Sequence, residues 1–119
     1  MRIDYHMHFE NGSYTLAWAK GFFESAQLRS IDEIGFAEHT HGFIEFKDLY
    51  YRELVLDESP VGQFQQTWLA SNKFKYSLQD YFAFMRELKQ QGYAAKIGIE
   101  VCNFHDHAAV QAILRDYPF

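Results

Sequence analysis

Three short strand-like segments, separated by stretches with helical periodicity, constrain the fold of this chain most strongly. They cover residues 2–8 (RIDYHMH), 33–39 (EIGFAEH) and 95–102 (AKIGIEVC). Strands that alternate with helices predict a parallel sheet covered by helices and joined by right-handed crossovers. We therefore expect an α/β protein whose functional groups gather at the C-terminal ends of the strands.

Helical periodicity and capping residues predict where the helices lie. They are expected over residues 14–28, from 77 to the turn at 92, and over 106–116. Ser13 and Asp106 are the expected N-caps, and Gly92 is a favourable residue just beyond a helix end. The pattern weakens between about 40 and 75, which we interpret as an irregular insertion. A length of 119 residues and the lack of a linker favour one domain, residues 1–119.

Composition excludes several classes of protein. The chain is 48% hydrophobic and 18% aromatic, enough to build a packed core. A formal charge of -5 argues against a nucleic-acid partner, which needs a basic surface. The single cysteine, Cys102, excludes an internal disulfide and suits a reducing compartment. No apolar run is long enough to span a membrane, and the N-terminus lacks a signal-peptide core, so we expect a cytoplasmic protein.

Alternation along each predicted strand separates a large apolar face from a small or polar face. The polar faces are expected to carry Asp4, His6 and His8 in the first strand, Gly35, Ala37 and His39 in the second, and Gly98, Glu100 and Cys102 in the third. Each of these faces has His or Glu near the C-terminal end of its strand. Agreement among three strands is a stronger indication than any single motif.

Imidazole and carboxylate groups at those strand ends indicate a metal site. His6 and His8 point to the same side of a strand, about 6–7 Å apart. Imidazole binds borderline divalent metals such as Zn, Fe and Mn. His39 and Glu100 come from the neighbouring strands, and a carboxylate that bridges two ions about 3.5–4 Å apart suits hydrolytic phosphoryl chemistry. The alternative is an ordinary α/β protein with unconnected core and surface histidines.

The order of these motifs resembles a known family. The matching segments are Asp4-Tyr5-His6-Met7-His8, Gly35-Phe36-Ala37-Glu38-His39, Gly98-Ile99-Glu100-Val101 and the closing residues 114–119. In this order they are similar to the N-terminal part of a PHP (polymerase and histidinol phosphatase) domain, in its histidinol-phosphatase branch. The resemblance implies a distorted (β/α)7 barrel, of which the chain holds about the first three βα units and is apparently truncated.

The same resemblance implies an activity and a set of ligands. It implies up to three divalent ions (Zn, Mn or Fe) in the intact domain and hydrolysis of L-histidinol phosphate in histidine biosynthesis. His6 and His8 then ligate one ion and His39 a second, while Glu100 bridges ions; His39 and Glu100 are the expected catalytic residues. Family members commonly carry another ligating His after the first pair, where this chain has Glu10. Glu10 is either a replacement ligand or a solvated loop acid.

The remaining candidates are weaker. His41 and Arg52 are expected to contact substrate, although each is also explained as a solvated side chain. His105 and His107 flank Asp106 in a loop and either bind metal or precede the next helix. Cys102 lies on the face of Glu100, but a buried inert thiol explains it as well.

Three functions remain open. The first is a metal-dependent phosphatase of histidinol phosphate, a cytoplasmic hydrolase of amino-acid biosynthesis in which the ions activate water. The second is another PHP-type phosphoesterase, and the third is a truncated, non-catalytic remnant that binds metal or a partner. The expected partner is a small phosphorylated metabolite, with no nucleic acid and no membrane. The open sheet edge predicts self-association, and the chain alone is expected to hydrolyse little or no histidinol phosphate.

Overall fold

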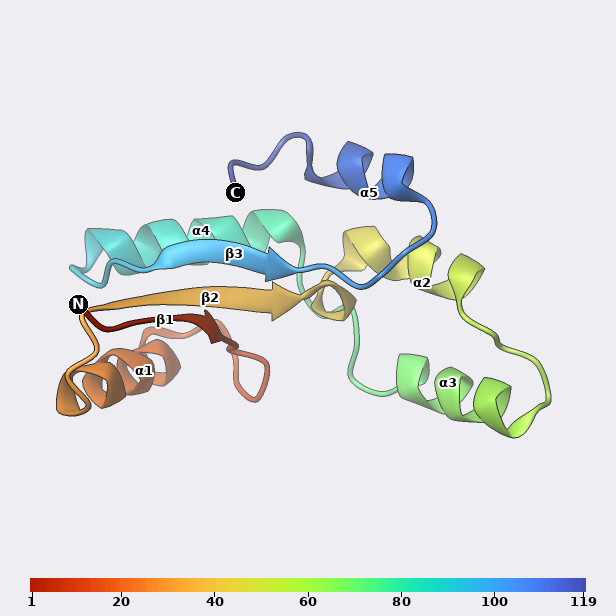
Figure 1. Ribbon diagram of the computed structural model, residues 1–119, viewed down its shortest axis with the longest axis horizontal. Coiled ribbons are helices and arrows are strands. Elements are labelled where there is room, and N and C mark those ends of the chain that lie inside the picture. Colours follow the sequence, from red (N-terminus) through yellow and green to blue (C-terminus); the bar gives the residue numbers. More distant parts are fainter. The chain divides into compact units, whose positions relative to one another are not determined.

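The computed structural model describes residues 1–119, which form two compact units (Figure 1). The first unit contains residues 1–39, 79–100 and 119. The second contains residues 40–78 and 101–118. Each unit is built from its own set of elements.

The first unit is built on a parallel sheet of three strands. These are β1 (Ile3–Met7), β2 (Glu33–His39) and β3 (Lys96–Glu100), in the order β1-β2-β3. The α/β class and the parallel sheet expected from the sequence are thereby confirmed. β2 and β3 pair without interruption, and this register places His39 opposite Glu100.

A β-bulge in β1 changes which side chains face which way. Asp4 pairs with Ile34, whereas Met7 pairs with Phe36, so β1 has one residue more than β2 between these pairs. As a result Tyr5 lies on the same face as His6: its hydroxyl donates to the Glu33 carboxylate. The expected alternation, which puts only Asp4, His6 and His8 of the first strand on the polar face, was therefore wrong at Tyr5, because strict alternation fails at a bulge.

Two helices of this unit contribute side chains to one face of the sheet. Helix α1 (Leu16–Leu28) places Phe22 against Phe36 of β2, with ring centroids 5.4 Å apart. Helix α4 (Leu78–Gln90) places Tyr81 under the strands, where its hydroxyl lies 3.2 Å from the Phe36 carbonyl and 3.0 Å from the Gly98 carbonyl. The N-cap of α1 is Thr15, whose side chain accepts from Trp18 N–H. Ser13, the expected cap, lies two residues too early.

Aromatic rings fill the space between the sheet and these helices. Phe9, at 0% exposure, stacks on Phe36 with ring centroids 3.7 Å apart. Phe22 and Phe84 meet the Phe9 ring edge-on. The opposite face of the sheet carries Gly35 and Gly98 and holds a shallow hollow within this unit. The sheet therefore has one packed face and one open face.

The second unit contains three α-helices. These are α2 (Lys47–Glu53), α3 (Pro60–Ala70) and α5 (His107–Leu114), and two 3₁₀ turns, Thr40–Gly42 and Ile44–Phe46, precede α2. Asp106 caps α5 by accepting from Ala109 N–H, as expected. The stretch expected to be irregular is more regular than its periodicity indicated, because Ser59 caps α3 and Pro60 occupies its first turn. None of the helices combines the length and apolar character that crossing a bilayer requires.

Candidate metal centre

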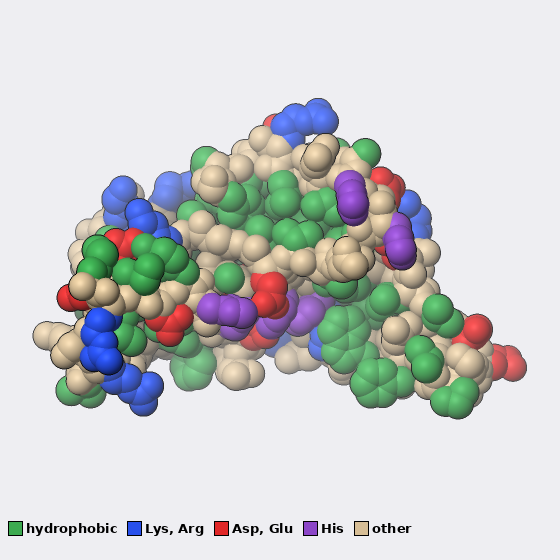
Figure 2. Space-filling model, in the orientation of Figure 1, with side chains coloured by type: hydrophobic (Ala, Val, Ile, Leu, Met, Phe, Trp, Pro, Cys, Tyr) green, Lys and Arg blue, Asp and Glu red, His purple; other side chains and the backbone are tan.

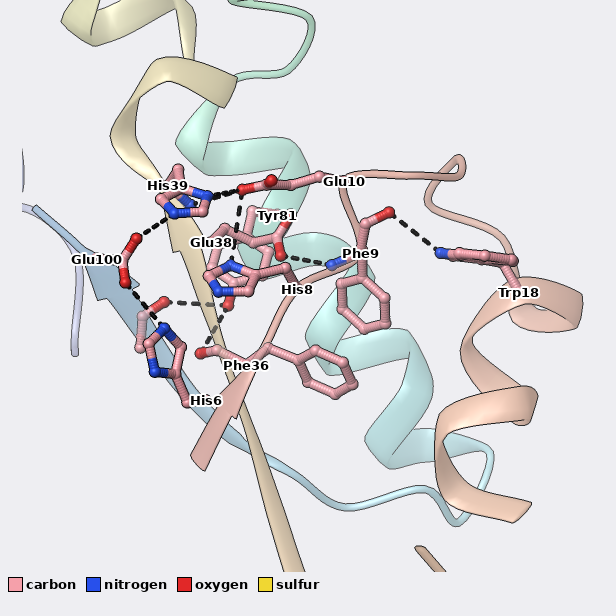
Figure 3. Close-up of polar contacts among 11 residues, drawn as sticks. His6, His8, Phe9, Glu10, Trp18, Phe36, Glu38, His39, Tyr81 and Glu100 are labelled. Carbon is pink, nitrogen blue, oxygen red and sulfur yellow. Dashed lines mark hydrogen bonds and ion pairs between the residues drawn. The ribbon is translucent and has the colours of Figure 1, made fainter. Parts of the chain in front are cut away.

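Five polar side chains meet at the C-terminal edge of the sheet in the first unit (Figure 3). His6 belongs to β1, His39 ends β2 and Glu100 ends β3. His8 and Glu10 come from the segment just after β1. Figure 2 shows histidine and acidic side chains side by side on the surface, in agreement with the contacts of Glu100 with His6 and His39.

Carboxylates alternate with imidazoles through the cluster. His6 Nε2 lies 2.8 Å from Glu100 Oε1, and the other oxygen of Glu100 contacts His39 Nε2. His39 Nδ1 in turn contacts Glu10 Oε1, which lies 3.6 Å from His8 Nδ1. Glu100 therefore joins β1 to β2, and Glu10 joins β2 back to the segment after β1.

The ring geometry keeps the donor atoms close together. The His8 and His39 rings stack with centroids 4.3 Å apart and an interplanar angle of 3°. The His6 and His8 centroids are 5.0 Å apart, and these rings meet edge to face. The bulge in β1 contributes to this arrangement, because it brings His6 into phase with the open face of the sheet.

Two groups of three donors are compact enough to hold a metal ion. They are His6, His8 and Glu100, and His8, Glu10 and His39, and within each group the donor atoms lie within 4.8 Å of one another. His8 Nδ1 is a buried nitrogen without a hydrogen-bond partner. A buried nitrogen that lacks a hydrogen bond and belongs to two groups of candidate metal ligands is the feature that best fits a cation in this cluster. Mixed imidazole and carboxylate donors suit Zn, Fe or Mn.

Burial and neighbouring charge favour the protonation states that metal binding requires. Burial, and then the nearby His39, lower the pKa of the His8 imidazole. Burial opposes ionisation of Glu10, but the hydrogen bonds with His39 and the electrostatic attraction of His39 and His8 together outweigh burial and lower the pKa of that carboxyl. Neutral His8 and ionised Glu10 are the forms that ligate metals.

Sequence reasoning missed a buried carboxyl behind the cluster. Glu38 is 4% exposed, and its Oε1 accepts from Phe9 N–H at 2.6 Å. Burial raises the pKa of this carboxyl to about 7, although the bond from Phe9 partly offsets the effect. The available signal was its place on an apolar face: Glu38 alternates with Phe36 and Ile34 along β2.

The two residues expected to contact substrate belong to the second unit. The His41 ring lies against Trp68, with centroids 5.1 Å apart. Arg52 pairs with Asp48 at 2.7 Å and lies 3.6 Å from Asp106. Each has partners within its own unit, and neither is among the five side chains of the cluster.

The other histidine pair is accounted for by helix capping. The backbone N–H groups of His105 and Asp106 donate to the Glu53 carboxylate, at 2.5 Å and 3.0 Å. His107 is the first residue of α5. Cys102 is exposed rather than buried, so the expectation of a buried thiol was wrong. None of these residues belongs to either three-donor group.

Comparison of the chain with protein-family models, curated proteins and solved structures found no match. The case for a function therefore rests on the geometry of the five-residue cluster and on the motifs that supply it.

Proposed function

We propose that this chain carries the metal centre of a PHP-type phosphoric monoester hydrolase. One observation carries the proposal: His6, His8, Glu10, His39 and Glu100 converge at the C-terminal edge of a parallel sheet. Parallel α/β folds place their functional groups at this edge. Unconnected histidines would have no reason to meet there with two carboxylates.

The proposal extends to the fold. We interpret the three strands as the first three of a distorted (β/α)7 barrel, with the open face of the sheet toward the barrel interior. The strand order β1-β2-β3 and the uniform parallel direction support this interpretation. The open face of the sheet supports it too, because Gly35 and Gly98 line a hollow there that is open to side chains from further strands.

Each residue of the cluster has a proposed role. His6 and His8 would hold one divalent ion, Glu10 and His39 would hold a second, and Glu100 would be shared between them. Divalent ions bound here would activate water and offset charge on the phosphoryl oxygens. His39 and Glu100 orient each other through their direct contact, so each is expected to matter for more than one ion.

L-histidinol phosphate is the proposed substrate, hydrolysed to L-histidinol and phosphate. The motifs around His8, His39 and Glu100 favour this branch of the family over its other phosphoesterases. The acidic charge of the chain also disfavours long nucleic-acid substrates. His41 and Arg52 remain proposed substrate contacts.

A second function, metal binding without turnover, is favoured by the exposure of the cluster. The side chain of His6 is 67% exposed and that of Glu100 is 38% exposed. Active sites work best where bulk solvent is excluded, because electrostatic interactions are stronger there. Metal and substrate binding therefore test the proposal more directly than turnover.

Calorimetry with L-histidinol phosphate, L-histidinol and a nucleoside monophosphate would test the substrate. With Mn²⁺ or Zn²⁺ present, histidinol phosphate should bind at least tenfold more tightly than histidinol and more tightly than the nucleotide. The preference should disappear with EDTA and in Glu100→Gln. Equal binding of histidinol and its phosphate by the metal-loaded protein would contradict the phosphatase assignment.

A further inference from the structure

The backbone of Phe9 is held on both sides by side chains that are not in the metal cluster (Figure 3). Phe9 lies between His8 and Glu10 in the chain, so its two peptide groups lead directly to two proposed ligands. Its N–H donates to Glu38 Oε1 at 2.6 Å, and its carbonyl accepts from Trp18 Nε1 at 3.1 Å. The fully buried ring stacks on Phe36, which fixes the residue between these bonds.

Glu38 is unusual for a side chain with only a packing role. It is the one carboxyl among the buried residues, and it forms no ion pair with a basic side chain. Burying a carboxyl without a cation costs stability, which an apolar residue at this position would avoid. Retention of an acceptor here makes sense if the Phe9 N–H must be held in one place.

Trp18 is positioned by a glycine as well as by its hydrogen bond. A Cβ atom at Gly12 would lie 2.5–2.7 Å from three atoms of the indole, so no larger residue fits without displacing it. The Gly12 N–H also donates to the Phe9 carbonyl, at 2.9 Å. The Phe9 carbonyl therefore accepts from two donors, one in the turn after β1 and one in α1.

We propose that Glu38 and Trp18 are positioning residues for the metal centre, acting through the Phe9 backbone. His8 and Glu10 are the neighbours of Phe9 in the chain, and both belong to the group His8, Glu10 and His39. Glu38 directly precedes His39 in β2. One segment therefore supplies the proposed ligand His39 and also the acceptor that fixes the Phe9 backbone between His8 and Glu10. The inference rests on the proposed function, because it assumes that these residues bind metal.

Four variants separate positioning from general stability. Glu38→Met removes the acceptor and keeps the side chain length, whereas Glu38→Gln keeps an acceptor oxygen. Trp18→Phe removes the indole N–H and keeps an aromatic ring. Met85→Ala is the control, because Met85 is buried in α4 and takes no part in these bonds.

Two measurements are needed, Mn²⁺ and Zn²⁺ affinity by calorimetry and hydrogen exchange of the Phe9 amide in the metal-free protein. We expect Glu38→Met to weaken metal binding about tenfold, in the range found for residues that orient ligands. Glu38→Gln should bind metal more tightly than Glu38→Met, because its amide oxygen still accepts from the Phe9 N–H. Trp18→Phe should lose less metal affinity than Glu38→Met, because the Gly12 N–H still donates to the Phe9 carbonyl. Phe9 should exchange faster in Glu38→Met than in Glu38→Gln.

The outcomes are distinguishable. Wild-type affinity in Glu38→Met, or equal losses in Glu38→Met and Glu38→Gln, would overturn the positioning role. An equal loss in Met85→Ala would overturn it too, because stability would then explain the effect. If Glu38→Met does not fold, the metal affinity of Trp18→Phe decides the question. An affinity equal to that of wild type would overturn the positioning role. A wild-type protein that binds neither ion would overturn the proposed function and this inference together, while Phe9 exchange would still report the hydrogen bonds.

Discussion

Glu10 differs from the other residues of the cluster in its origin. It comes from the turn after β1 rather than from a strand, and it reaches both His39 and His8. A carboxylate is a harder ligand than an imidazole and favours ions such as Mn²⁺ over softer ones. Glu10 is therefore the residue most expected to set the metal preference of its group.

Replacement of Glu10 should remove one ion rather than two. Glu10→Gln leaves the group His6, His8 and Glu100 intact. We expect the variant to retain about one equivalent of metal fewer than wild type after dialysis, with its fold preserved. Metal analysis together with circular dichroism checks this. Loss of all bound metal in Glu10→Gln would mean that the two groups do not bind separately.

Metal retention should depend on pH through the histidines. Only neutral imidazole ligates, so binding releases protons and weakens as pH falls toward the usual His pKa of about 6.5. The lowered pKa of His8 means that this residue stays neutral to a lower pH than a free histidine. Dialysis at a series of pH values should show metal loss on acidification, and constant metal content well below pH 6 would argue against histidine ligation.

At the scale of elements, the Glu53 side chain at the end of α2 forms hydrogen bonds with the backbone at the start of α5. Its carboxylate accepts from His105 N–H and Asp106 N–H, which lowers the pKa of Glu53, mainly through the bond from His105. A lowered pKa in the folded state means that the ionised form stabilises the fold. This stabilisation is present above the unfolded pKa of Glu53 and is lost as pH falls through the lower, folded value.

Glu53→Gln should therefore reduce the acid sensitivity of the second unit. We expect the variant to be less stable than wild type near pH 7 and to lose less stability on acidification to pH 3. Glu58→Gln is a suitable control, because Glu58 makes no side-chain ion pair. Thermal denaturation between pH 3 and pH 7 measures the difference, and parallel pH profiles for wild type and Glu53→Gln would contradict the role.

Some elements follow from local sequence and others do not. The three strands and the helices that begin near 16, 78 and 107 have clear periodicity or caps, so the sequence predicts them. The β1 bulge was not predictable from alternation, because the extra residue is defined only by pairing with β2. Helix α3 was underestimated because its periodicity is weak, even though Ser59-Pro60 is a recognisable start.

The same distinction applies to the site. His6, His8, His39 and Glu100 were predictable because parallel strands bring their C-terminal ends together. The alternation argument brought these four together despite the bulge, since its error affected Tyr5 instead. Glu38 and Trp18 were not identified, because their role depends on the backbone of Phe9, a partner distant in sequence from Glu38. Sequence patterns therefore predict the members of a side-chain cluster more readily than the residues that we propose to position them.

At the scale of the whole molecule, the edges of the sheet bear on activity. β1 and β3 are the edge strands, and β3 carries Glu100 at its end. An unpaired edge is a template for pairing with another strand. We therefore expect the chain to self-associate as its concentration rises, and phosphate release per chain from L-histidinol phosphate to rise with it from a very low value.

Sedimentation and phosphate release measured on the same samples would check this expectation. Glu100→Gln serves as the control for metal-dependent hydrolysis, since it leaves the backbone edge of β3 unchanged. A strictly monomeric chain with rapid turnover at every concentration would contradict it, because the exposed cluster would then be sufficient for catalysis.

The most direct test of the metal centre is the metal content of the metal-loaded protein. Wild-type protein would be loaded with Zn²⁺, Mn²⁺ or Fe²⁺, dialysed and analysed by mass spectrometry beside Glu100→Gln and His107→Gln. We predict that wild type retains at least one ion per chain, that Glu100→Gln retains less than half as much, and that His107→Gln matches wild type. No retained metal in wild type, or equal retention in Glu100→Gln, would contradict a metal centre at the ends of these three strands.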